Sequence, residues 1–191
     1  MSNSQLNIPN LKLCQKGPYR LEGTVFLQPW VGYVSQEMRR CNIKEGTDGH
    51  IPLVIGEMPE EQDEDIFVMP QQVVAYEYMV QEAKHVHDII LAHIFKYYNE
   101  SEEIQGFREG MEHYEQIYGP SDKEMEPILP DITSSEQLKS LISLGCVRLY
   151  DADEWQSMVC YGFNSWDVAH GLSVLMLRDQ VREIGITAGE L

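Results

Sequence analysis

The stretch that decides the fold runs from residue 70 to residue 98 and reads PQQVVAYEYMVQEAKHVHDIILAHIFKYY. Its apolar residues recur at steps of three and four, at Val73, Tyr76, Val80, Ala83, Val86, Ile90, Ile94 and Tyr97. This spacing draws one stripe along a helix, and Pro70 suits the first helical position because its ring fixes φ and it lacks an N–H. The sequence therefore predicts one long amphipathic helix over 70–98, which must cover an apolar surface formed elsewhere in the chain.

Patterns typical of β-strands lie on both sides of this helix. Before it, residues 19–35 predict a strand, a turn at Pro29 and a second short strand at 31–34. Residues 50–56 predict a third strand, and Pro52 favours an edge position or the start of that strand. After the helix, four runs of β-compatible residues predict strands over 146–150, 158–163, 172–177 and 181–186. A hairpin turn is expected at 178–180.

A short helix is expected between the long helix and the last four strands. Thr133, Ser134, Ser135 and Glu136 have the form of a capping box, in which the first and fourth side chains bind each other's backbone N–H groups. Leucine and isoleucine residues follow, and Gly145 supplies a stop signal. The segment therefore has a marked beginning and a marked end.

These patterns predict an α+β fold with antiparallel β-sheet units at both ends of the chain, one long amphipathic helix and one short helix. We expect a single domain over 1–191, since a chain of 191 residues is long enough to bury its own core. Its expected parts are an N-terminal β unit (1–56), the long helix (70–98), an acidic linker region (99–130), and a short helix with a β meander (133–191).

The charge of the chain excludes several classes of partner. The sequence has 31 acidic and 14 basic residues, a net charge of −17. Such a protein is repelled by nucleic acid phosphates and by anionic lipid headgroups, so we expect neither a nucleic acid nor a membrane as its partner. At 43% hydrophobic residues, the composition is still that of an ordinary globular domain.

Two short stretches carry most of this charge. Residues 57–65 hold six acidic and no basic residues, and residues 99–126 hold nine acidic and two basic residues. One interpretation is a solvated surface that keeps the protein soluble. The other is an anionic patch that meets a basic protein partner, with Glu60, Glu61, Asp63, Glu64 and Asp65 as its candidate residues. Both interpretations remain open at this point.

The sequence predicts a soluble, cytoplasmic protein. Its first residues lack the basic and apolar regions of a secretory signal, and no run approaches the roughly 18 apolar residues of a membrane helix. The four cysteines, Cys14, Cys41, Cys146 and Cys160, form no CxxC pair and no metal-binding spacing. We therefore interpret them as buried or incidental thiols.

The most distinctive segment is the connection between two predicted strands at 163–172, which reads FNSWDVAHGL. Trp166, Asp167 and His170 are its candidate binding residues, because loops on a rigid scaffold often hold functional side chains. Asp167 and His170 could also assist Cys160 or Ser173 as a nucleophile, although no nucleophile motif is present. The sequence favours a structural interpretation over both, in which Trp166 packs into the core and the turn positions the next strand.

No metal or cofactor site is predicted. His85 and His87 lie two residues apart on the predicted helix, so their side chains face different ways and cannot chelate one ion together. The chain has no phosphate-binding loop and no dinucleotide fingerprint. We name no catalytic residue.

Three motifs occur in a fixed order along the chain. They are Gly23-x-Val25-x-Leu27-x-x-Trp30-x-Gly32-Tyr33, then Pro70-x-Gln72-Val73-x-Ala75-Tyr76-x-Tyr78, then Trp166-Asp167-x-x-His170-Gly171-Leu172 followed by Val181-x-x-Ile184-Gly185. In this order they resemble an uncharacterised family of bacterial domains of unknown function. That family commonly has Glu before the histidine and Gly after the Gly-Leu pair, where this chain has Ala169 and Ser173. The resemblance implies no activity, cofactor or substrate.

Two hypotheses follow from these observations. The first is a non-catalytic, acidic protein-interaction module of the immunity-protein or adaptor type, which binds a basic partner. The second is a small-ligand-binding protein or enzyme that uses the turn of Trp166, Asp167 and His170. We favour the first, because the concentration of charge is the stronger of the two signals.

Overall fold

Seven strands form one mixed β-sheet in which the spatial order follows the chain order. The computed structural model describes residues 8–9, 11–13, 21–35, 38, 46–55, 68–118, 129–150, 157–166 and 171–186. The strands are β1 (Lys12–Leu13), β2 (Leu21–Phe26), β3 (His50–Ile55), β4 (Ser143–Leu149), β5 (Val159–Asn164), β6 (Leu172–Leu177) and β7 (Gln180–Gly185). All neighbouring strands run antiparallel except β3 and β4, which are parallel. The fold is therefore α+β, and the two predicted β units join in a single sheet.

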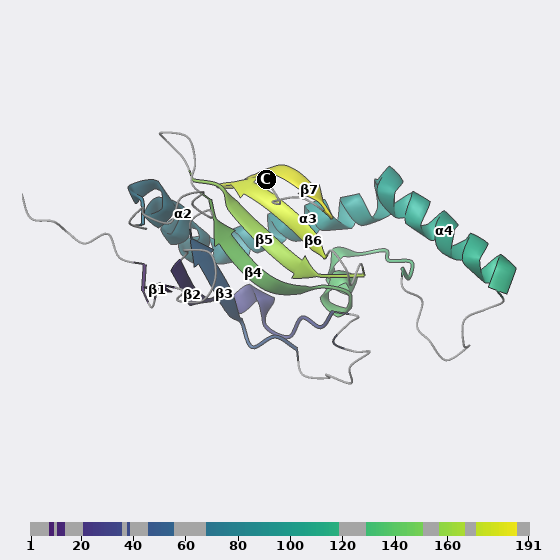
Figure 1. Cartoon of the computed structure of the whole chain (residues 1–191), viewed down its shortest axis with the longest axis horizontal. Helices are drawn as coiled ribbons and strands as arrows, with labels where there is room; N and C mark the ends of the chain where they lie inside the picture. Colours follow the sequence, from purple (N-terminus) through teal and green to yellow (C-terminus); the bar gives the residue numbers. More distant parts are fainter. Residues whose placement is uncertain are drawn as a thin grey trace, which may run out of the picture.

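The long connection between the two parallel strands contains four of the described helical segments. They are α2 (Pro70–Gln81), α3 (Ala83–Glu100), α4 (Glu102–Tyr118) and a short 3₁₀ helix, η2 (Ser135–Ser140). A parallel pair requires a connection that returns to the starting end of the sheet. Figure 1 shows α3 crossing behind the sheet and α4 extending away from it at one end.

The core lies between this crossover and one face of the sheet. On β3, Ile51, Leu53 and Ile55 are buried while His50 and Pro52 are exposed, which is the alternation of a half-covered strand. Their partners from α3 include Ile90, Ile94 and Tyr98, all fully buried in the same cluster. Each such side chain contributes roughly 1.5–3 kcal/mol when it leaves water.

The predicted helix over 70–98 is present but divided. α2 ends at Gln81, and Glu82, with φ −101° and ψ 22°, leaves the helical conformation before α3 begins. The two helices pack on different partners, since α2 contacts β4 whereas α3 contacts β7, η2 and the turn after β2. An unbroken helix of this length would be about 43 Å long, against roughly 20 Å for a six-residue strand. The break at Glu82 lets α2 and α3 point in different directions, so that each helix packs against its own part of the core.

The predicted second strand at 31–34 is wrong. Residues Gln28–Trp30 form a 3₁₀ turn, η1, and residues 31–35 are irregular. Their backbone groups bind loops in place of a strand, because Gly32 N–H donates to the Thr47 carbonyl and Val34 N–H donates to the Lys139 carbonyl. Gly32 has a φ of +81°, which favours glycine and turns the chain so that Trp30 enters the core.

The segment predicted as an acidic linker region is largely helical, because α4 occupies Glu102–Tyr118. Its start is capped by Ser101, whose Oγ accepts a hydrogen bond from Ile104 N–H at 3.2 Å. Glu102 and Glu103 stand in the first turn, where the helix dipole favours negative charge.

The predicted short helix and the last four predicted strands are all present, but the predicted stop at Gly145 is wrong, because the helix ends at Ser140 and Gly145 lies within β4. The helix is the 3₁₀ helix η2, and its capping contact falls one residue later than expected, because the Gln137 side chain accepts a hydrogen bond from Ser134 N–H at 3.0 Å. The predicted hairpin turn between the last two strands is shorter than expected, with Leu177 paired to Gln180.

Gly171, which directly precedes β6, provides a test of this architecture. Its φ is +73°, and a Cβ there would lie 2.6 Å from the carbonyl oxygen of Phe163. We expect Gly171→Ala to lower the free energy of unfolding by about 1–3 kcal/mol, measured by urea denaturation. Gly185→Ala is the control, since nothing lies within 4 Å of its Cβ position. Equal losses in the two variants would contradict this account.

Candidate functional site

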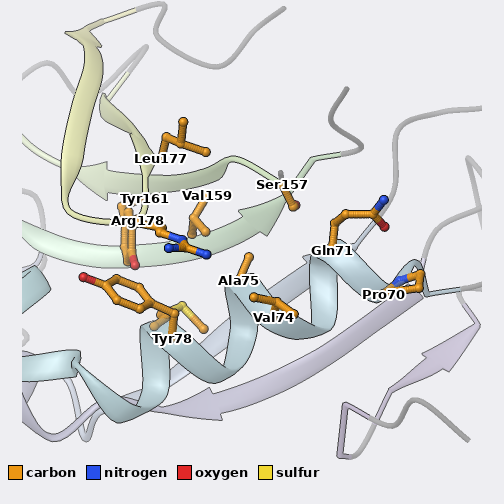
Figure 2. Close-up of a pocket in the computed structure, with 11 residues that line it drawn as sticks. Pro70, Gln71, Val74, Ala75, Tyr78, Ser157, Val159, Tyr161, Leu177 and Arg178 are labelled. Carbon is orange, nitrogen blue, oxygen red and sulfur yellow. The ribbon is translucent and has the colours of Figure 1, made fainter. Parts of the chain in front are cut away.

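A pocket of about 350 Å³ lies between α2 and the sheet (Figure 2). Its α2 wall is formed by Pro70, Gln71, Val74, Ala75, Tyr78 and Met79. Its sheet wall is formed by Ser157, Val159, Tyr161, Leu177 and Arg178. Pockets for small molecules span about 300–1,000 Å³ and are mostly apolar with a few placed polar groups, and this pocket has both properties.

Polar groups gather at one end of the pocket. Figure 2 shows Tyr78 from α2, Tyr161 from β5 and Arg178 from the β6–β7 turn at the same end, away from Pro70 and Gln71. Burial raises the pKa of Tyr161 well above its usual value, and the charge of Tyr78 adds to the effect. Burial, with the nearby charges of Asp179 and Glu82, also raises the pKa of Tyr78. Both phenols are protonated donors at neutral pH.

Arg178 has an unusual backbone. Its φ is +55°, and it is the one non-glycine among the described residues with a positive φ. A side chain in this region costs of order 1–2 kcal/mol, so the turn holds Arg178 in a conformation that glycine would adopt freely. No described carboxylate lies within ion-pair distance of its guanidinium.

A second pair of polar side chains, Tyr33 and His87, is buried where α3 packs against the turn after β2. The Nε2 atom of His87 lies 2.8 Å from the hydroxyl of Tyr33, and its Nδ1 atom lies 3.0 Å from Oδ1 of Asp88. An ionised Asp88 only accepts, so Nδ1 carries the proton and Nε2 accepts from the tyrosine. The His87 ring also packs edge-on against Trp30 at 4.6 Å.

The buried pair of Tyr33 and His87 has a structural role and does not form a binding site. Burial lowers the pKa of His87, against the opposing effect of Asp88, so the ring is neutral at pH 7. Burial raises the pKa of Tyr33 to about 12, and the charge of Asp88 adds to it. Tyr33 and His87 are both buried, so no substrate reaches the pair. The exposed His85 shares no contact with it, as the two-residue spacing predicts.

The predicted turn is only partly described. Trp166 is 3% exposed and packs edge-on against Tyr98 from α3, with ring centroids 4.9 Å apart. Asp167 and His170 lie outside the described residues, and so do Glu60, Glu61, Asp63, Glu64 and Asp65. Trp166 thus has the packing role that the structural interpretation predicts, and the binding role of the turn stays a prediction.

The two described cysteines are free thiols. Cys160 is buried on the sheet face opposite the core, and that burial raises its pKa. A raised pKa makes a thiol a poor nucleophile, so the environment of Cys160 is that of a structural residue. Cys14 and Cys41 lie outside the described residues.

The surface of α4 was not predicted as a site. Ile104 is fully buried against the body of the protein, and Arg108 lies over the ring of Tyr98 with its Cζ atom 5.1 Å from the ring centroid. Phe107 is 38% exposed, and Glu109 and Glu112 are exposed. The overlooked signal is the spacing of three and four residues at Ile104, Phe107, Met111, Tyr114 and Tyr118.

The described segments give no sign of a metal centre or a membrane span. No three His, Cys, Asp or Glu side chains among them gather where an ion would be held. In the same segments, no helix combines the length and the apolar character needed to cross a bilayer.

A family model described as a domain of unknown function, DUF6985, matches residues 22–191. Neither a curated protein nor a solved structure matches the chain.

The neutral state of His87 predicts a pH dependence of stability. Because its pKa is lowered in the folded protein, the unfolded chain binds the proton first as the pH falls below about 6.5. We expect the free energy of unfolding to decrease between about pH 7 and pH 5, and His87→Gln to flatten this decrease. Urea denaturation at several pH values measures it, with His85→Gln as an exposed control on the same helix. A His87→Gln profile that parallels the wild type would refute the assignment.

Proposed function

The chain belongs to the DUF6985 family of domains of unknown function. For this member we propose a non-catalytic, acidic protein-interaction module that binds a basic protein partner through α4. The observation that carries the proposal is the exposed, amphipathic surface of this helix. An adaptor or immunity-type role fits a domain that works by occupying a surface of another protein.

The packing of α4 supports this proposal. The helix has 17 residues, yet among residues 102–113, whose side chains the structure describes, Ile104 in the first turn is the buried one. An isolated helix of this length is marginal in water, because most helical stability in proteins comes from packing of an apolar face. Phe107 and Met111 continue the apolar stripe along α4. The helix extends away from the sheet (Figure 1). A partner that covers this stripe would supply the missing packing.

Two glycines in α4 support it independently. Gly106 and Gly110 each cost roughly 1 kcal/mol relative to alanine inside a helix. No heavy atom lies within 4 Å of the Cβ position of either residue, so the described chain makes no use of the missing side chains. Close approach of a partner would use them, because glycine lets another chain reach the helix backbone.

The charge of α4 supports a basic partner. Acidic side chains border the apolar stripe at Glu103 and Glu112, and Glu102 and Glu109 lie on the opposite face of the helix. Arg108 is directed onto Tyr98. An acidic rim speeds association with a basic surface and makes the affinity depend on salt. We place this interaction in the bacterial cytoplasm, where thiols such as Cys146 and Cys160 remain reduced.

The other hypothesis has less support. A ligand site at Trp166, Asp167 and His170 would need the indole at a surface, and Trp166 is almost fully buried. The interaction module is therefore the function that the described geometry favours.

Affinity capture from a lysate of the source cell tests this proposal. The wild-type chain and a Phe107→Ser/Met111→Ser variant serve as baits, at about 50 mM and about 500 mM salt. We expect a basic protein that the wild type retains at low salt, that the variant retains at least tenfold less, and that high salt releases. Phe26→Ser is the matched control, since Phe26 is also exposed, at 48%, but lies on β2.

Two results would contradict the proposal. One is a set of captured proteins that is the same for the wild type and the α4 variant. The other is a stable dimer of the chain itself, seen by light scattering, that the α4 variant dissociates.

Alanine in place of Gly106 and Gly110 gives a second test that separates binding from stability. We expect the double variant to raise the free energy of unfolding by up to about 2 kcal/mol and yet to weaken partner capture, because the methyl groups stand where the partner backbone would lie. Urea denaturation and the same capture assay measure the two effects. A double variant that is more stable and binds as well as the wild type would show that the glycines serve no interface.

A further inference from the structure

We propose that the pocket between α2 and the sheet binds a small monocarboxylate with an apolar body, whose carboxylate is held by Arg178 and the hydroxyl of Tyr161. This site is separate from α4 and goes beyond the interaction function proposed above.

The apolar part of the pocket is open to a ligand. Val74 on α2 is 52% exposed, although it faces Val159 and Leu177 across the pocket (Figure 2). Scattered exposed valines are common, but this one belongs to a concave apolar wall. Burying such a wall against a hydrocarbon contributes about 25 cal/mol for each Å² removed from water.

Tyr161 contributes a phenol hydroxyl to the lining of the pocket. The side chain is 2% exposed and lines the pocket. A ligand acceptor placed against this hydroxyl, in a pocket largely shielded from water, would form a hydrogen bond worth about 0.5–1.5 kcal/mol. Since its pKa is raised, the phenol stays protonated at neutral pH and can donate a hydrogen bond to a ligand acceptor.

Arg178 adds a cation beside this hydroxyl. Its guanidinium stands at the same end of the pocket as Tyr78 and Tyr161 (Figure 2), and its positive charge opposes the rise in the pKa of Tyr78. The turn keeps Arg178 at a φ of +55°, a strained conformation that a non-functional turn would avoid with glycine. A planar guanidinium fork pairs in two-point fashion with a carboxylate.

The chemistry of the ligand follows from these three groups. The Arg178 guanidinium can only donate, and the protonated hydroxyls of Tyr161 and Tyr78 can donate beside it, so the group favours an anionic acceptor. The positive charge of Arg178 disfavours a protonated amine. The carboxylates of Asp179 and Glu82 act on Tyr78 with the opposite sign, which disfavours a doubly charged phosphate more than a singly charged carboxylate. One arginine balances one negative charge. The apolar wall then requires a hydrocarbon body attached to that carboxylate.

Isothermal titration calorimetry with octanoate, octanol and octylamine tests the proposal on the full chain. The three probes share a hydrocarbon body and differ in charge. We expect octanoate to bind at least tenfold more tightly than octanol, and octylamine to bind most weakly. Octanol or octylamine binding as tightly as octanoate would overturn the proposal, and so would the absence of octanoate binding at millimolar concentration.

Substitutions locate the site. Arg178→Gln and Tyr161→Phe are each expected to weaken octanoate binding about tenfold and to leave octanol binding nearly unchanged. Arg182→Gln and Tyr76→Phe are the matched controls, because both residues lie outside the pocket lining. Equal effects of pocket and control variants would overturn the assignment.

A further variant keeps the test valid if Tyr161→Phe disturbs the buried site. Val74→Trp adds a large side chain at a half-exposed position, so the fold tolerates it while the pocket is filled. We expect it to abolish octanoate binding and to leave partner capture by α4 unchanged. Retained octanoate binding in this variant would place the ligand elsewhere and overturn the proposal.

Discussion

The parallel pairing of β3 with β4 is the constraint on which the rest of the structure depends. Leu53, Val54 and Ile55 pair in register with Val147, Arg148 and Leu149. Two strands that run side by side in the same direction cannot be joined by a hairpin, so the chain between them must return along the sheet. That return carries α2 and α3 over one face, supplies the core, and leaves α4 at the far end of the crossover.

The sequence predicts the local elements of this fold well and its long-range pairing poorly. The last strands and the apolar stripe of 70–98 are encoded by neighbours two, three or four residues apart, which a pattern records directly. The β3–β4 pairing joins residues about ninety positions apart, and no local pattern records it. The break at Glu82 is similarly hidden, because neither Pro nor Gly marks it and the change of packing partner causes it.

The same distinction explains the candidate sites. Trp166 stands out in the sequence because tryptophan is rare and this one lies in a distinctive turn. A tryptophan in such a turn can bind a ligand or pack in the core, and here it packs against Tyr98. The pocket residues are ordinary by type, and they come from α2, β5 and the β6–β7 turn. Only the folded sheet brings Tyr78, Tyr161 and Arg178 together. For α4, glycine content and charge obscured a helical spacing that was present in the sequence.

A net charge of −17 does not prevent one part of the molecule from binding an anion. α3 separates α2 from α4 by 18 residues, about 27 Å at 1.5 Å per residue. The Debye length is about 8 Å at physiological salt, so the carboxylates of α4 contribute almost nothing to the potential at Arg178. What a ligand meets in the pocket is set by the few groups that line it. The same screening confines the attraction of a basic partner to the acidic helix, so the two ends of the crossover present different chemistry to their surroundings.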